Sequence, residues 1–387
     1  MSTLLKDLQC PSTTGFELGL KPIHGTPYTV RWILDAFGKE CLIREEEISN
    51  VAVSNINEGS GFVSQILKIV LHLKDKRTCS FVLKVPDSSL IDKSFNGTVS
   101  DGNAAYFNRE IEFYREFSLT NFPLPTIYKT VLWKPGKATG ALLMEDLSQS
   151  CFVQPVSQTL TLKQLLVIAE HLADMHNLYL SLTEEEKQEY QKSFSVLKDC
   201  ISFRTQIFDP KVRELRDRHP NLLGRKVTPV LEHLADSNYH RYASSTLSDQ
   251  FNLPRVLVHG DLWSNNILWN SENPSEVAAY IDWQGFFIGN LAFDLSRILV
   301  LCTSSSIRRS HTQTVLSHYF SSLKNPTFSK EAVFSAFKET LPYQVAHMMF
   351  VIRLLEDTYS KPELEEMLDR VVCVLDDIAD HETMYRK

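Results

Sequence analysis

The pattern of apolar and polar positions changes period along the chain, and these changes predict the first elements. Apolar residues at helical spacing predict a helix over residues 26–40. From Ile48 to Val85 the pattern alternates and is interrupted by the polar segment 74–77, which predicts three antiparallel strands. The polar stretch 87–102, with its Gly, Ser and Asp residues, predicts a mobile loop.

A strong helical pattern follows over residues 103–117. Glu110 lies on its apolar face together with Phe107 and Tyr114. Because burying a carboxylate without a partner is unfavourable, Glu110 is expected to pair with a cation. Prolines then interrupt the chain before a second pair of strands, which ends over residues 141–147.

Beyond residue 150 the pattern is mainly helical, with an apolar stripe from Leu162 to His176. The change from strands to helices near residue 147 predicts two lobes within one domain. Residues 1–147 would form an N-terminal lobe with an antiparallel sheet and a helix, and residues 148–387 a larger, mostly helical C-terminal lobe. The predicted fold class is therefore α+β and bilobal.

Composition narrows the possible partners. The 387 residues are 43% hydrophobic and 22% charged, and the net charge of −7 gives no indication of nucleic acid or an anionic membrane as a partner. Neither a signal segment at the N-terminus nor a long apolar run for a membrane span occurs. The seven cysteines are widely spaced, which argues against a disulfide framework or a zinc site. We therefore expect a cytoplasmic protein, with its oligomeric state left open.

The segment Val258–Leu268 contains the pattern His-x-Asp-x₄-Asn, with Asp261 and Asn266, and a short apolar strand after it ends on Asp282. Kinase-type phosphoryl-transfer enzymes have these residue types in this order. Asp261 could engage the hydroxyl of an acceptor, while Asn266 and Asp282 could supply the oxygen ligands that Mg²⁺ prefers. The alternative is a surface turn, because Asp and Asn are common turn residues. The second Asp after an apolar strand favours the catalytic interpretation.

Lys84 lies near the end of a predicted strand between apolar neighbours, and Glu110 is its candidate partner. Kinases use such a pair to hold the α- and β-phosphates of ATP, whereas the alternative is an ordinary edge or surface lysine. Gly59, Ser60 and Gly61 lie in the first predicted turn, where glycines let backbone N–H groups approach a phosphate. A simple tight turn would have the same residues. The sequence has no G-x₄-G-K-[ST] motif, which excludes a P-loop protein.

Three further polar residues are predicted to have structural roles. His176 lies on a leucine stripe and is expected to be a core histidine. Asp294 could cap a helix or anchor the candidate catalytic loop. His259 is expected to brace this loop rather than to transfer protons.

Together these motifs resemble those of the ecdysteroid-kinase-like, or choline-kinase-like, group of small-molecule kinases, which is related to aminoglycoside phosphotransferases. The resemblance extends from about residue 50 to residue 300 and rests on six segments: Gly59–Phe62, Lys84, Arg109–Tyr114, Met144–Leu147, His259–Asn266 and Ile281–Gln284. It implies a bilobal, protein-kinase-like fold that binds ATP between the lobes, with an acceptor pocket in the helical C-terminal region.

The resemblance also implies a role for each matching residue. Asp261 would be the catalytic residue, and Asn266 and Asp282 would be the ligands of Mg²⁺. Lys84 and Glu110 would anchor the phosphates of ATP. The hinge that meets adenine through its backbone would consist of Glu145, Asp146 and Leu147.

The segment after Asp282 differs from that of a protein kinase. Trp283 and Gln284 replace the usual Phe-Gly, and Asp294 comes only twelve positions after Asp282, too close for an activation segment. We therefore expect ATP- and Mg²⁺-dependent phosphorylation of a hydroxyl on a small organic molecule, such as a steroid or a xenobiotic conjugate. One alternative is choline or ethanolamine kinase, which Gly260 and the residues after Asp282 fit less well. A nucleotide-binding pseudokinase is the other, and the complete motif set argues against it.

Overall fold

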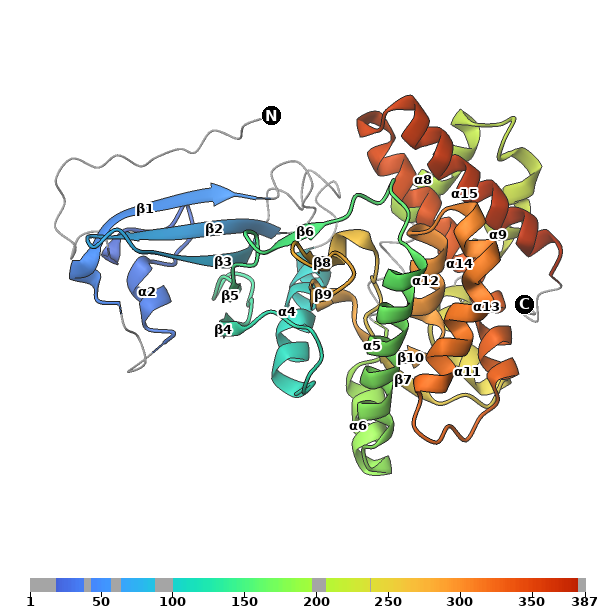
Figure 1. Ribbon diagram of the computed structural model, residues 1–387, viewed down its shortest axis with the longest axis horizontal. Coiled ribbons are helices and arrows are strands. Elements are labelled where there is room, and N and C mark those ends of the chain that lie inside the picture. Colours follow the sequence, from blue (N-terminus) through green and yellow to red (C-terminus); the bar gives the residue numbers. More distant parts are fainter. Residues whose placement is uncertain are drawn as a thin grey trace. The chain divides into compact units, whose positions relative to one another are not determined.

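The computed structural model describes residues 19–37, 43–56, 64–87, 100–196, 207–236 and 238–381, in two compact units (Figure 1). The first unit comprises Met1–Ser118 and Pro125–Gln149, and the second comprises Leu119–Leu124 and Ser150–Lys387. The predicted glycine turn with Gly59, Ser60 and Gly61 lies outside the described residues, as does most of the predicted loop 87–102.

The first unit is built on a five-stranded antiparallel sheet (Figure 1). Its strands are arranged β1-β2-β3-β5-β4, so that β3 lies in the middle of the sheet. The predicted meander of three strands and the later strand pair are both confirmed. The strand bounds are Ile48–Asn55 (β1), Ser64–Leu73 (β2), Thr78–Pro86 (β3), Ile127–Val131 (β4) and Ala141–Glu145 (β5).

Helices α2 and α4 of the first unit differ in length from their predictions. Of the helix predicted over residues 26–40, residues 26–37 are described, and the helix within them is α2 (Val30–Leu34). The helix begins later than predicted because the Thr29 side chain accepts a hydrogen bond from the backbone N–H of Trp32 and thereby caps its N-terminus. Helix α4 (Ser100–Glu116) begins slightly earlier than predicted.

Alternation along β3 separates the two faces of this sheet. Leu83 packs into the cluster that contains the buried residues of α2. Val82 points to the opposite face, where Tyr114 of α4 packs against its cluster. Because side chains two apart in a strand share a face, Lys84 lies on the same side as Val82, toward α4.

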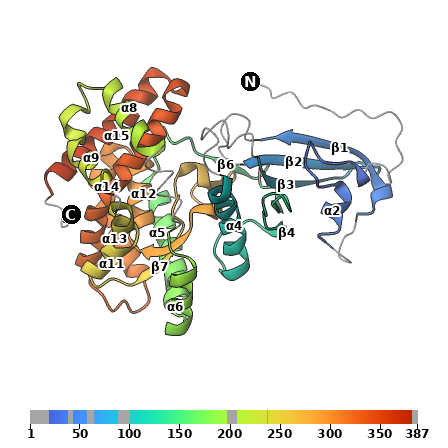
Figure 2. The same cartoon turned by 180° about the vertical axis from the view of Figure 1, so that it is seen from behind.

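The second unit is mostly helical, as predicted (Figures 1 and 2). The apolar stripe of α5 is buried, and His176 within it has its Nδ1 2.6 Å from the hydroxyl of Tyr319, which confirms a core histidine. The helices are Leu162–Leu180 (α5), Glu184–Ser193 (α6), Asp209–Arg218 (α8), Thr228–Leu234 (α9), Tyr239–Arg241 (α10), Leu247–Gln250 (α11), Phe293–Leu301 (α12), Ser305–Ser322 (α13), Lys330–Leu355 (α14) and Lys361–Ala379 (α15).

Short strands add two small antiparallel sheets to the second unit, one of β10 and β7 and one in the order β6-β8-β9. Except for the strand before Asp282, they were not predicted, because three or four residues are too few to establish a period. The strands are Cys151–Val153 (β6), Arg255–Val258 (β7), Ile267–Asn270 (β8), Val277–Tyr280 (β9) and Phe287–Asn290 (β10).

The described residues bear on two of the expectations from composition. Within these ranges, no helix combines the length and apolar character that crossing a membrane requires. The cysteines there are free thiols: Cys79, Cys151, Cys302 and Cys373.

Candidate active site

The candidate catalytic loop leaves strand β7 at Val258 and enters β8 through a short 3-10 helix, η6 (Ser264–Asn266). Gly260 has a positive φ of 83°, and a Cβ at this position would lie 2.2 Å from the backbone oxygen of Gly285. The loop therefore requires glycine here, both for its backbone conformation and for its close approach to η7 (Trp283–Gly285).

Asp294 anchors this loop from the first turn of α12. Its Oδ2 accepts a hydrogen bond from the N–H of His259 at 2.7 Å, and its Oδ1 accepts one from the N–H of Gly260 at 3.0 Å. Burial raises the pKa of the Asp294 carboxyl to about 6, although the two N–H groups counteract this shift. Of the two structural roles predicted for Asp294, the loop anchor is confirmed. The N-cap residue of α12 is Ala292, not Asp294.

His259 braces the loop from within, as expected from the sequence. Its Nε2 lies 3.0 Å from the backbone oxygen of Ile281, and its Nδ1 accepts a hydrogen bond from the N–H of Asp261 at 3.3 Å. Since a carbonyl oxygen can only accept, the proton of the ring is on Nε2. Burial lowers the pKa of His259 to about 4, so that the ring is neutral near pH 7.

Pairing of β8 with β9 brings Asn266 and the residues just after β9 together. Ile267 is the partner of Tyr280 in the ladder, and the N–H of Ile281 donates to the backbone oxygen of Asn266 at 3.1 Å. Asp282 comes directly after this contact, in the left-handed conformation with φ 66° and ψ 56°. Such a backbone is unfavourable for most residues other than glycine, and strain of this kind is concentrated at functional sites.

The donor set at Asn266 and Asp282 suits a hard divalent cation. The amide nitrogen of Asn266 donates to the backbone oxygen of Asp261 at 2.7 Å, which turns the amide oxygen away from this contact. Asp282 contributes a carboxylate, whose Oδ2 accepts from the side chain of Gln284 at 3.1 Å. Across the described ranges, no group of three or more His, Cys, Asp or Glu side chains could hold a metal ion. Two oxygen ligands suit Mg²⁺, which retains water and phosphate ligands.

Asp261 forms an ion pair that the sequence analysis missed. The Nη1 of Arg297 lies 2.8 Å from its Oδ1, and the arginine side chain is only 2% exposed, whereas that of Asp261 is 36% exposed. Burial raises the pKa of the Asp261 carboxyl above its ordinary value, Arg297 opposes this shift, and Asp282 adds to it. The available signal was a single cation in the apolar run Leu295–Leu301, which requires a partner just as Glu110 did.

The first unit contains the predicted ion pair between Lys84 and Glu110. Lys84 stands opposite Ile66 of β2 and Leu142 of β5, in the middle of the sheet. Its Nζ lies 2.7 Å from Oε2 of Glu110, and both side chains are buried. Their role toward a nucleotide stays a prediction.

The predicted hinge begins at Glu145, the last residue of β5, and its acidic side chains form contacts inside the first unit. Glu145 accepts hydrogen bonds from the N–H and the hydroxyl of Thr126 at 3.1 and 3.0 Å. Asp146 lies 3.0 Å from Nζ of Lys68, and although burial raises the pKa of its carboxyl, hydrogen bonds, including those from Ser148, bring it below its ordinary value. Leu147 follows in irregular backbone. These contacts leave the backbone of the segment as the part predicted to bind adenine.

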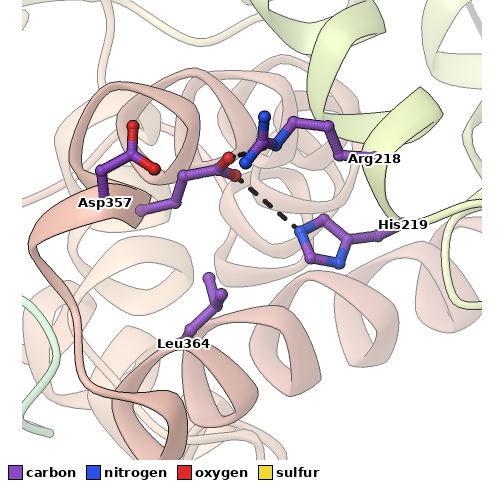
Figure 3. Close-up of a pocket in the computed structure, with 5 residues that line it drawn as sticks. Arg218, His219, Asp357 and Leu364 are labelled. Atoms are coloured by element: carbon purple, nitrogen blue, oxygen red, sulfur yellow. Dashed lines mark ion pairs between the residues drawn. The ribbon is translucent and has the colours of Figure 1, made fainter.

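A separate hollow of about 330 Å³ lies in the second unit beside η8 (Glu356–Thr358), and it contains none of the predicted site residues (Figure 3). The buried carboxylate of Glu356 forms an ion pair there with Arg218 of α8, and its other oxygen lies 3.8 Å from Nε2 of His219. Arg353 of α14 is a second guanidinium at 3.7 Å. The two arginines share one carboxylate and link α8 to the end of α14, which indicates a structural cluster.

Two known proteins of Caenorhabditis elegans are similar to most of this chain. A "Uncharacterized kinase-like protein D1044.1" of Caenorhabditis elegans is 25% identical over 358 residues, which are 85% of this chain and 93% of that protein. The "Uncharacterized oxidoreductase dhs-27" of the same organism is 25% identical over 384 residues, and these cover 92% of this chain but 45% of that protein. The chain thus spans less than half the length of this relative.

Among solved structures, the GDP complex of a mutant aminoglycoside 2'-phosphotransferase-IIIa matches with a TM-score of 0.49 and 14% sequence identity, over 91% of this chain and 97% of that chain. The kinase-like relationship predicted from the motifs is confirmed by the kinase-like relative. A family model described as "Uncharacterized oxidoreductase dhs-27" matches residues 66–383, and the chain therefore belongs to this family, DUF1679.

Proposed function

We propose that the protein transfers the γ-phosphoryl group of ATP, with Mg²⁺, to a hydroxyl of a small organic molecule. The observation that carries this proposal is the arrangement of the loop, in which Asn266 contacts Asp261 and is joined through β-pairing to the residue before Asp282. This arrangement combines an acceptor-directed carboxylate with two oxygen ligands for a cation, as phosphoryl transfer requires.

Asp261 would orient the acceptor hydroxyl. As the acceptor oxygen bonds to the γ-phosphorus, the bond from this phosphorus to the bridging oxygen of ADP breaks, and the hydroxyl proton passes to the carboxylate. Asn266 and Asp282 would hold Mg²⁺, which when bound neutralises charge on the phosphates. Positioning rather than a strong base is the main demand, since the transition state is loose and the acceptor bond forms late.

The Lys84–Glu110 pair supports the same proposal from the first unit. A buried lysine held by a buried carboxylate presents a cation of fixed position, which suits the α- and β-phosphates. The backbone of residues 145–147 would bind adenine, because the side chains of Glu145 and Asp146 are engaged elsewhere.

The oxidoreductase name of one relative does not lead to a second proposal. This chain matches 45% of that protein, and its sequence contains no G-x-G-x-x-G segment of the kind that binds a dinucleotide. A kinase reaction is favoured because, within the second unit, Asn266 contacts Asp261 and is joined by β-pairing to the residue before Asp282.

The direct test is incubation of the chain with ATP, Mg²⁺ and a mixture of hydroxylated metabolites that includes steroids, choline and ethanolamine. Mass spectrometry should detect a metabolite that has gained a phosphoryl group, only with Mg²⁺ present and not with the Asp261→Asn variant. Nucleotide binding without transfer to any acceptor would indicate a pseudokinase and contradict the proposal.

A further inference from the structure

We propose, building on the kinase function above, that Arg297 is a positioning residue: it holds Oδ1 of Asp261, so that Oδ2 is the oxygen presented to the acceptor hydroxyl. The Nη1 of Arg297 donates to Oδ1 at 2.8 Å. Oδ2 has the longer contact of 3.3 Å with the amide nitrogen of Asn266. The shorter of these two contacts is thus made by Oδ1, and the carboxyl also has a side-chain hydrogen bond with Trp263.

Helix α14 holds the guanidinium in turn. The Nε of Arg297 donates to Oε1 of Gln344 at 3.0 Å, and the amide nitrogen of Gln344 donates to the backbone oxygen of Phe293 at 3.2 Å. Gln344 therefore joins α14 to α12 and fixes the arginine at the same time. A planar guanidinium that is bound at several nitrogens has little freedom to rotate, so its hydrogen bond defines the orientation of the carboxylate.

His347 completes the contacts of this arginine. Its Nε2 lies 2.8 Å from Nη1 of Arg297 and 3.6 Å from Oδ1 of Asp261. Since an arginine can only donate, Nε2 of His347 must accept, and the ring proton must be on Nδ1. The buried ring of Phe208, 5.7 Å from the histidine ring between centroids, packs beside it. A neutral histidine in this tautomer accepts a hydrogen bond from the guanidinium. Because it has no charge, it leaves the ion pair between Arg297 and Asp261 in place.

The test uses the full chain, with MgATP turnover to ADP in the absence of an added acceptor and binding of a fluorescent ATP analogue as its two readouts. Arg297→Gln should lower turnover by about a hundredfold, as misplacement of a reacting group does, while analogue binding changes less than about twofold. Arg297→Lys should retain part of the turnover, because it keeps the charge but loses the planar fork.

Arg308→Gln is the matched control, because Arg308 is also a buried arginine with an ion-pair partner, Asp377, and is not part of the candidate site. It should lower the melting temperature but leave turnover per folded molecule unchanged. Equal turnover of the wild type and Arg297→Gln would overturn the role of Arg297 alone. A wild type that turns over no ATP, with or without hydroxylated acceptors, would overturn the kinase function and this role with it.

Nitrogen NMR of ¹⁵N-histidine-labelled chain provides a readout that does not depend on turnover. The His347 signal, assigned with a His347→Gln variant, should have the proton on Nδ1 in the wild type and should change in Arg297→Gln. A wild-type proton on Nε2 would show that His347 does not accept from Arg297, and the proposed arrangement would be wrong.

Discussion

Each unit contains one ion pair at the centre of its candidate chemistry, and the two pairs differ in how far they are closed. Lys84 and Glu110 are both buried, so the pair forms a closed contact between a strand and a helix. Arg297 is equally buried, but its partner Asp261 remains partly exposed. A closed pair can present only a cation of fixed position, whereas a half-open pair can present a carboxylate to a reacting group. The difference matches the proposed division of labour between nucleotide anchoring and acceptor positioning.

Removing the half-open carboxylate is expected to have the largest effect. Asp261→Asn should lower phosphoryl transfer by about 10²–10⁴-fold, because a positioned acid–base group contributes this much, with nucleotide binding retained. Turnover kinetics together with nucleotide titration measure both quantities. Asp249→Asn, at an exposed ion pair with Arg255, is the control and should be active. Transfer within a few fold of the wild type would contradict the role of Asp261.

Opening the closed pair should affect stability as well as nucleotide use. Lys84→Met leaves the Glu110 carboxylate buried without its cation, which should lower the free energy of unfolding by roughly 3–5 kcal/mol. The double variant Lys84→Met/Glu110→Gln should recover much of this stability in denaturant unfolding. If Lys84 anchors the phosphates, the Michaelis constant for ATP should be raised in both variants.

The control for this pair is Lys361→Met, which removes one partner of an exposed pair with Glu365 and should change neither quantity. An unchanged Michaelis constant in the stable double variant would separate Lys84 from the nucleotide site. The pair would then be structural only.

Loosening the loop that carries Asp261 should have a smaller effect. In Asp294→Asn, only one oxygen remains to accept the N–H groups of His259 and Gly260, so one buried donor loses its acceptor. The free energy of unfolding should fall by about 1–3 kcal/mol. Denaturant unfolding measures this change, and Asp369→Asn, at an exposed contact with Ser305, is the control. Equal stability of both variants would contradict the anchor.

The last effect concerns how stability depends on pH, and it involves the core of the second unit. Burial lowers the pKa of His176 to about 3, compared with about 6.5 for an unfolded histidine. The unfolded chain binds more protons between these values, so the stability present above pH 6.5 is lost as the pH falls through this window. His176→Gln should reduce the slope of the free energy of unfolding against pH by at most about 1.4 kcal/mol per pH unit. His259, with a pKa of about 4, contributes in the same direction.

Unfolding midpoints at several pH values between 4 and 7 check this prediction. His24→Gln, at an exposed position of the first unit, is the control variant. Identical dependence in the wild type and His176→Gln would show that the buried ring is not kept neutral.

Elements with a long and regular pattern were predictable. The alternation between Ile48 and Val85 and the apolar face of α4 led to the sheet, and the carboxylate on that face led to the contact of Glu110 with Lys84. The short strands around the candidate loop have no such pattern, because their pairing depends on neighbours far along the chain. The first residue of α2 depended on a single cap at Thr29.

By itself, the sequence determined the residue types for the proposed reaction. Such a reaction needs an Asp, an Asn and a second Asp in this order, and the chain has them as Asp261, Asn266 and Asp282. Only the tertiary structure decided which groups surround Asp261. Arg297 of α12 contacts Asp261, which lies 36 residues earlier in the chain. Gln344 and His347 of α14, which hold Arg297, lie about 50 residues later. Contacts over such separations follow from the packing of helices against the loop, and local spacing contains no record of them.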